Sequence, residues 1–339
     1  MLEIARDTLF QFLASDEQLL SAAHDVLFLR AQNCSQLNLF AGKNLVCQQS
    51  FKPEYELLEK RGFSPVTEFT GKVDLCLCLG SRQRDENFIQ FANGIDALSE
   101  GGTFLCCLPK ELGAGRFERE LKRVGGESIL FVKNHCRVFG LKRSGPLDEA
   151  VLAEWRALAE LRPIPETKLL SRPGIFGWDK IDQGSKLLVS QLPELIGVVG
   201  DLGSGYGFLA QHVLQRGAAL QELHLFEAEK LALDASQQSF AFHERAEKIR
   251  YHWHDVCAGL PKIKFDAIVC NPPFHSGKQV NVTLGEKFIV AAAGALKKEG
   301  QLYMVANSTL PYERTLQKHF RSFTQLAAER GFKVLQALK

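Results

Sequence analysis

The stretch Phe265-Asp-Ala-Ile-Val-Cys-Asn-Pro-Pro-Phe274 begins as an apolar run and ends abruptly at two prolines. The apolar run, Phe265 to Cys270, predicts a buried strand of a parallel sheet. Each proline lacks an N–H and has a fixed φ, so the segment after the strand is stiff and its carbonyls lack a strand partner. We therefore expect the Asn271 side-chain oxygen and the Pro272 carbonyl to accept hydrogen bonds from one planar amino group of a ligand. We expect the Phe274 ring to lie against the ligand ring that carries this amino group.

Strand-like and helix-like stretches alternate along the whole chain, which predicts an α/β protein with parallel sheets. A chain of 339 residues exceeds the size at which single hydrophobic cores usually divide. The stretch Lys142-Arg-Ser-Gly-Pro146 interrupts the alternation, and a predicted helix follows it. We therefore expect a first domain at residues 1–145, a linker helix and loop at 146–166, and a second domain at 167–339.

The two predicted domains resemble each other in sequence. Val73-Asp-Leu-Cys-Leu-Cys-Leu-Gly80 matches residues 265–272, and Ala97 to Cys107 matches Ala295 to Val305. A duplicated domain is the simplest account. The first copy has Gly80-Ser81-Arg82 in place of the two prolines, and no glycine follows its first strand. We expect this copy to be degenerate, with a role as scaffold or in RNA binding.

A second motif lies at Ile196-Gly-Val-Val-Gly-Asp-Leu-Gly-Ser-Gly-Tyr-Gly207, where a predicted strand enters a glycine loop. Gly203 and Gly205 would let the backbone approach a ligand closely. A dinucleotide-binding fingerprint would need a glycine at position 208, where Phe208 stands. Asp201 would repel a pyrophosphate and suits a cationic ligand instead.

Two further acids end predicted strands. Glu227 closes the strand that begins at Leu223, and a carboxylate there can accept from both hydroxyls of a ribose. Asp255 closes the next strand, together with His252 and His254. These histidines suggest a metal, but no further ligand is evident, and we expect none to be bound.

The motifs together resemble those of a known family. Asn271 to Phe274 resembles the Asn-Pro-Pro-aromatic motif of amino-group methyltransferases, and Asp201 to Gly207 resembles motif I of the class I methyltransferases. With Pro173-Gly-Ile-Phe176, Asp182-x-Gly-Ser185 and the two-copy layout, the chain resembles the guanine-N2 methyltransferases of bacterial ribosomal RNA. Within that family it is more similar to the C type, which acts on the small subunit, than to the G type.

The resemblance implies two tandem Rossmann-like domains, each with a mostly parallel sheet of the seven-stranded type and an antiparallel last strand. It implies transfer of a methyl group from S-adenosyl-L-methionine to the exocyclic N2 of a specific guanine in 16S ribosomal RNA of the 30S subunit. The residues that it assigns to the cofactor are Asp201, Gly203, Gly205, Glu227, Asp255 and Asn271. Those that it assigns to the guanine are Asn271, Pro272 and Phe274.

RNA contacts are expected from basic residues. His275 and Lys278 flank the proline loop, and Arg116 and Arg119 lie on a predicted helix whose apolar residues face inward. Solvated surface is the alternative for all of them. The net charge of +2 permits a polyanionic partner without requiring one.

Nine cysteines lie without any C-x-x-C pair, several of them in apolar runs, which predicts reduced buried thiols. The sequence has no basic segment leading into an apolar run and no apolar window of about 18 residues. We expect a cytoplasmic monomer with no membrane partner.

Three other functions stay open. The substrate can be a guanine of 23S ribosomal RNA instead. A protein glutamine methyltransferase would use the same acceptors, but such enzymes usually carry tyrosine after the prolines and lack the first copy. A non-catalytic ribosome assembly factor would bind no cofactor, and the intact Asp201, Glu227 and Asn271 favour an enzyme.

Overall fold

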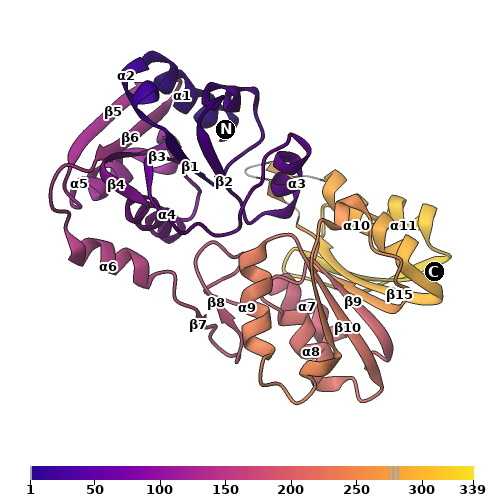
Figure 1. Cartoon of the computed structure of the whole chain (residues 1–339). Coiled ribbons are helices and arrows are strands. Elements are labelled where there is room, and N and C mark those ends of the chain that lie inside the picture. Colours follow the sequence, from indigo (N-terminus) through magenta and orange to yellow (C-terminus); the bar gives the residue numbers. More distant parts are fainter. Residues whose placement is uncertain (1, 274, 277–278, 281) are drawn as a thin grey trace. The chain divides into compact units, whose positions relative to one another are not determined.

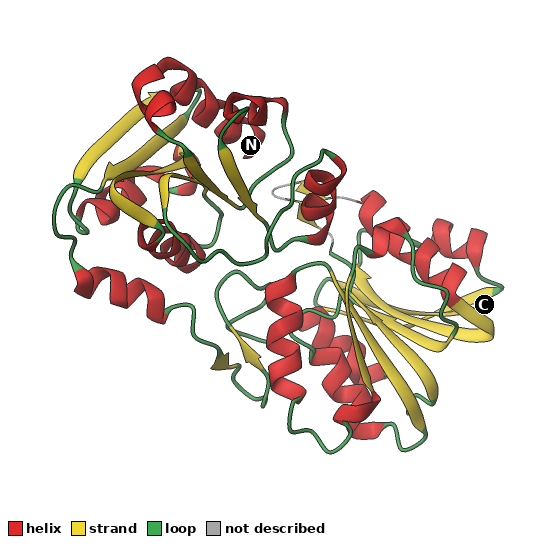
Figure 2. Cartoon of the chain, in the orientation of Figure 1, coloured by secondary structure: helices red, strands yellow, loops and turns green. Residues whose placement is uncertain are grey.

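The computed structural model describes residues 2–273, 275–276, 279–280 and 282–339. The chain forms two compact units, Met1–Glu160 and Leu161–Lys339. Each unit is an α/β sheet flanked by helices (Figures 1 and 2). Of the described helices, none is long and apolar enough to cross a membrane.

The first unit is built on a six-stranded sheet in the order β2-β1-β3-β4-β6-β5. Its first four strands run parallel, and β6 is antiparallel to both β4 and β5. This is one strand fewer than the expected type, because beyond β2 only an isolated bridge forms, between Gln48 and Val66. The strands are β1 (Asp25–Leu29), β2 (Asn44–Gln48), β3 (Val73–Leu79), β4 (Leu98–Pro109), β5 (Glu127–Lys133) and β6 (Cys136–Lys142).

Helices cover both faces of this sheet. One face packs on α4, α5 and α6 and the other on α1 and α3, because the apolar residues of each helix fall on one side. The helices are α1 (Leu2–Ser15), α2 (Glu17–Ala22), α3 (Lys52–Lys60), α4 (Arg84–Asp96), α5 (Ala114–Lys122) and α6 (Glu149–Ala157).

Helix α6 falls in the stretch that the sequence analysis expected to be a linker. Asp148 caps it by accepting from the backbone N–H groups of Ala150 and Val151. Trp155 is fully buried and stacks on Phe88 of α4, with ring centroids 5.1 Å apart. The helix therefore packs into the core of the first unit.

The second unit is built on a seven-stranded sheet in the order β11-β10-β9-β12-β15-β17-β16. The strands from β11 to β15 run parallel, and β17, the last strand of the chain, is antiparallel to both of its neighbours. The strands are β9 (Gly197–Leu202), β10 (Leu220–Glu227), β11 (Ile249–Trp253), β12 (Phe265–Cys270), β15 (Leu296–Asn307), β16 (Ser322–Glu329) and β17 (Phe332–Leu338).

Helices α7, α8 and α9 cover one face of the second sheet, and α10 and α11 cover the other (Figure 1). Two short two-stranded pairs, β7 with β8 and β13 with β14, complete the unit. The helices are α7 (Gln183–Gln191), α8 (Phe208–Arg216), α9 (Lys230–Phe240), α10 (Val282–Ala295) and α11 (Glu313–His319). The short strands are β7 (Arg162–Pro163), β8 (Leu170–Ser171), β13 (His275–Ser276) and β14 (Gln279–Val280).

The matching sequence stretches occupy matching places in the two sheets. Asp74 of β3 accepts from the N–H groups of His24 and Asp25 at the start of β1. Asp266 of β12 likewise accepts from the N–H of Val198 at the start of β9. The same aspartate-to-backbone hydrogen bonding between central strands, at aligned positions, agrees with a duplicated fold.

Candidate active site

The predicted site residues of the second unit gather at one edge of its sheet. Strands β11, β10, β9 and β12 are parallel neighbours, so their carboxyl ends meet there. In the same order, these carboxyl ends carry Asp255, Glu227, the loop 203–207 and Asn271; Glu227 is the last residue of β10 and the others lie just beyond their strands. The strand order reverses between β9 and β12, and such a switch point is where open α/β sheets bind ligands.

The glycine loop turns sharply from β9 toward α8. Gly203 and Gly205 have φ of 72° and 54°, a left-handed conformation that favours glycine. A Cβ at Gly205 would have no atom within 4 Å, so the backbone at this position borders open space. A ligand can therefore lie directly against the loop.

Asp201 is the penultimate residue of β9. The side chain is fully buried, and neither carboxyl oxygen has a hydrogen-bond partner among the described residues. Burial, with the charge of Glu227 added, raises its pKa to about 8. Because Leu202 still belongs to β9, Asp201 lies within the strand rather than beyond its end.

Glu227 is held by backbone donors. Its Oε2 accepts from the N–H of Gly205 at 2.7 Å, and its Oε1 accepts from the N–H of Glu229 at 2.8 Å. Burial raises its pKa even though these bonds favour the charged form. Each carboxylate oxygen has a second lone pair, so the group can still accept from hydroxyls of a ligand.

Asp255 lies two residues beyond β11. Its Oδ1 accepts from the N–H of Cys257 at 2.8 Å and caps a short 3-10 helix, Val256–Ala258. His252 bonds instead to His224, with 2.9 Å between His252 Nε2 and His224 Nδ1. His254 Nε2 contacts the Gly259 carbonyl, so the two histidines considered as metal ligands have different partners.

Asn271 follows directly after β12 and is half-buried. Its Nδ2 donates to Oδ2 of Asp182 at 2.9 Å and to Oγ of Ser185 at 2.8 Å. No hydrogen bond to its Oδ1 is found within the described part of the chain. Pro272 beside it is buried and Pro273 is exposed.

Phe274 and Lys278 lie outside the described residues, and the side chain of His275 in β13 is not described. Arg116 and Arg119 are exposed on α5, whose Phe117 and Leu121 are buried. Their predicted contacts with RNA stay predictions.

The corresponding edge of the first unit is filled by its own side chains. Arg30 follows β1 with φ of 54°, where Gly203 follows β9, and its guanidinium pairs with Glu86. Its N–H donates to Oε1 of Gln48 at 3.1 Å, so an amide stands in the place of the Glu227 carboxylate. Leu79, buried, occupies the position that aligns with Asn271.

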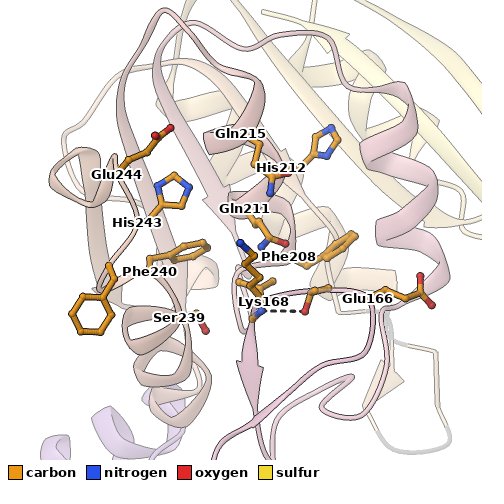
Figure 3. Close-up of a pocket in the computed structure, with 13 residues that line it drawn as sticks. Glu166, Lys168, Phe208, Gln211, His212, Gln215, Ser239, Phe240, His243 and Glu244 are labelled. Carbon is orange, nitrogen blue, oxygen red and sulfur yellow. Dashed lines mark hydrogen bonds between the residues drawn. The ribbon is translucent and has the colours of Figure 1, made fainter.

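A hollow of about 920 Å³ lies elsewhere on the second unit (Figure 3). It is bordered by α8, by the end of α9 and by the segment 166–169, with Gln211 and His243 among the lining residues. None of the predicted cofactor or guanine residues lines it. The edge that carries Asn271 is therefore the better candidate for chemistry.

Asp182 and Ser185 were noticed in the sequence only as part of a family pattern, without a role. Asp182 caps α7 by accepting from the N–H of Ser185 at 2.8 Å. An aspartate immediately before a run of helical spacing is a usual signal for this cap. The contact with Asn271, 89 positions away, had no signal in the sequence.

The chain matches a known protein family. The family model described as "Methyltransferase small domain" matches residues 166–336, half of the chain. The chain belongs to this family. The matched range covers all but the first five and last three residues of the second unit, and all of the edge described above.

Similarity to individual proteins extends over both units in some cases and over about half of the chain in others. The ribosomal RNA small subunit methyltransferase C of Psychromonas ingrahamii is 27% identical over 312 residues, covering 89% of this chain and 88% of the relative. The same-named protein of Chromohalobacter salexigens is 36% identical over 176 residues, covering 50% of this chain and 51% of the relative. The structure of the T. thermophilus 16S rRNA N2 G1207 methyltransferase, solved with AdoMet and guanosine, covers 95% of this chain and 91% of that one, with a TM-score of 0.78 and 23% identity. The two-unit fold is thus shared.

Proposed function

We propose that this protein transfers a methyl group from S-adenosyl-L-methionine to the exocyclic N2 of a guanine in 16S ribosomal RNA. The observation that carries the proposal is the Asn271 carboxamide beside two prolines at the sheet's switch point, held through Nδ2 and with no hydrogen bond to Oδ1 among the described residues. The relatives named for this reaction support the choice of substrate.

The residues present fit the cofactor. S-adenosyl-L-methionine supplies a methyl group on a cationic sulfur and carries an ammonium group. The buried carboxyl of Asp201, which has no hydrogen-bond partner among the described residues, would offer negative charge to such a ligand once it has lost its proton, and the loop at Gly203 and Gly205 would let the ligand lie close. Glu227 would accept from the ribose hydroxyls, and Asp255 would lie toward the adenine.

The protein's task in the reaction is orientation. The guanine N2 lone pair is delocalised, so Asn271 Oδ1 and the Pro272 carbonyl would hold the two amino hydrogens and favour the positive charge that develops on nitrogen. The cofactor would supply the methyl group to the N2 lone pair, and the electron pair of the C–S bond would stay with sulfur. One amino proton then passes to water. Alignment at about 3–3.5 Å would supply much of the acceleration.

The guanine must leave its stack to reach this edge, and Phe274 would replace the lost stacking at about 1–3 kcal/mol. His275, Lys278, Arg116 and Arg119 would contact phosphates. We further propose that the 30S subunit is the substrate, that no metal takes part, and that the protein is a cytoplasmic monomer.

The test uses labelled cofactor and several acceptors. Purified protein is incubated with tritium-labelled S-adenosyl-L-methionine and with 16S RNA, 30S subunits, 23S RNA or 50S subunits, and RNA and protein are then separated. Digestion to nucleosides should give labelled N2-methylguanosine from 16S RNA or 30S subunits. Label only in 23S RNA, or only in protein, would overturn the proposal in favour of the corresponding alternative. No cofactor binding by calorimetry would indicate an assembly factor.

A further inference from the structure

The side chain of Asn271 is fixed by two neighbours that leave it one orientation. The carboxyl oxygen Oδ2 of Asp182 lies 2.9 Å from Asn271 Nδ2, and Ser185 Oγ lies 2.8 Å from the same atom. The Asp182 oxygen also accepts from the N–H of Ser185. Both amino hydrogens of Asn271 are therefore directed into the protein.

The charge of Asp182 decides which way the amide faces. An ionised carboxylate can only accept hydrogen bonds, so the Asn271 atom that faces it must be the nitrogen. With the amide reversed, two oxygens would meet at hydrogen-bond distance without a hydrogen between them, and the Asn271 donors would point at the ligand. An amide with only neutral hydroxyl neighbours would have no such preference, because a hydroxyl both donates and accepts.

We propose that Asp182 and Ser185 are positioning residues that lock the Asn271 carboxamide with Oδ1 toward the amino group to be methylated. The role rests on the proposed function of Asn271 and adds two residues to it. Neither residue needs to touch the substrate. They act by fixing the orientation of the Asn271 amide, so that this side chain presents only its acceptor oxygen to the ligand.

The surroundings keep Asp182 in place. It is the N-cap of α7, and α7 packs against β15 and β17 of the same sheet that carries Asn271. A Cβ at Gly184 would lie 3.1 Å from Asp182 Oδ2 and 3.0 Å from the Phe332 ring. The absence of a side chain at Gly184 therefore leaves room for both the carboxylate and Phe332.

Capping and positioning can be separated by substitution. In Asp182→Ser the hydroxyl still caps the helix, because serine is a good N-cap, but it ends short of Asn271. In Asp182→Asn an oxygen can remain for both donors while the charge is lost. Ser185→Ala removes only the second contact. Asp148→Ser makes the same change at the N-cap of α6 and serves as the matched control.

The expected results concern kcat more than binding. Asp182→Ser should lower kcat about 10-fold or more while the Kd for cofactor changes by less than about 2-fold. Asp182→Asn should recover part of that loss, Ser185→Ala should lower kcat less than Asp182→Ser, and Asp148→Ser should leave kcat unchanged. In an Asn271→Ala background, Asp182→Ser should change kcat by less than about 2-fold, because the residue it positions is gone.

If Asp182 only stabilised the fold, the kcat losses of Asp182→Ser and Asn271→Ala would be additive in the double variant. Additivity in this double-mutant cycle would overturn the proposal. A second readout is independent of catalysis. In the ¹⁵N spectrum of the whole protein, the Asn271 side-chain NH2 signals, assigned with Asn271→Ala, should be protected from solvent exchange and lose that protection in Asp182→Ser. Unchanged protection would also overturn the proposal. Failure of the proposed function is a different outcome, since the wild type would then methylate no guanine while the NH2 signals still respond to Asp182→Ser.

Discussion

Asp201 and Glu227 lie on neighbouring parallel strands, and the charge of Glu227 adds to burial in raising the pKa of Asp201 to about 8. Glu227 is compensated by backbone N–H groups, whereas Asp201 has no hydrogen-bond partner within the described residues. Near neutral pH, in the absence of a ligand, the protonated form of Asp201 is therefore lower in free energy than the charged form. A cationic ligand would replace that proton.

The first prediction concerns the stability of the ligand-free protein. Between pH 4 and pH 8 the folded state keeps the Asp201 proton while the unfolded state has lost it, because the pKa rises from 3.8 to about 8 on folding. The contribution of this group to stability therefore falls as pH rises through that window. Asp201→Asn cannot titrate and should raise Tm at pH 8 by about 2–4 °C or more relative to wild type, with a smaller gain at pH 5. Thermal melts at both pH values check this, and equal gains at both would contradict it.

The second prediction concerns cofactor affinity. Because Asp201 must lose its proton to attract an ammonium group, the Kd for S-adenosyl-L-methionine should fall as pH rises from 6 to about 8. Asp201→Asn should weaken binding at pH 8 and flatten this dependence. Calorimetric titrations over the range measure both. A variant whose pH dependence matches that of wild type would show that another group, such as the cofactor's own amine, is responsible.

A third prediction uses two glycines of α10. A Cβ at Gly285 would lie 1.9 Å from the hydroxyl oxygen of Tyr312, whereas a Cβ at Gly294 would meet nothing within 4 Å. Gly285→Ala should therefore destabilise the protein by about 1–3 kcal/mol through overpacking. Gly294→Ala in the same helix should stabilise it by about 0.5–1 kcal/mol, because alanine loses less backbone entropy. Chemical denaturation compares the two, and a stable Gly285→Ala variant would disprove the close contact.

A fourth prediction tests where α6 belongs. Trp155 is fully buried against Phe88, so Trp155→Ala should cost about 3–5 kcal/mol. The loss should be local. Hydrogen exchange should speed up in β3, β4 and α4 of the first unit while β9, β10 and β12 keep their protection. Faster exchange confined to the second unit would show that α6 supports that unit instead.

The fifth prediction concerns RNA. Each phosphate contact that is lost should lower the slope of log affinity against log salt by about 0.7–0.9. Arg116→Ala with Arg119→Ala should therefore reduce the slope by about 1.5, with little change in the Kd for cofactor. Arg321→Ala, an exposed arginine of the second unit paired with Glu299, is the control. A double variant with the same slope as wild type would assign Arg116 and Arg119 to solvated surface.

Strong local patterns made much of the fold predictable. The apolar runs gave β3 and β12, and the glycine loop placed the turn from β9 into α8, because these signals depend only on neighbouring residues. Strand β2 was missed, since Asn44-Leu-Val-Cys-Gln48 is short and polar at both ends. Helix α6 was predicted, but its packing partner was not, because the Trp155–Phe88 contact joins residues far apart in sequence.

The candidate site divides in the same way. The order of Asp255, Glu227, the glycine loop and Asn271 along one sheet edge follows from parallel strands, and the sequence supplied each residue. The burial of Asp201 was not predicted, because a motif does not say whether an acid lies before or beyond the end of a strand. The hydrogen bonds from Asn271 to Asp182 and Ser185 depend on tertiary packing, so only the structure shows them.

Arg30 in the first unit bears on how a duplicated gene can change. Substitution of Arg30 alone would leave the largely buried Glu86 without its ion-pair partner. Gln48 and Leu79 would still occupy the positions where the second copy has a carboxylate and a carboxamide. Reversal of the first unit to a ligand-binding edge would therefore require several substitutions together.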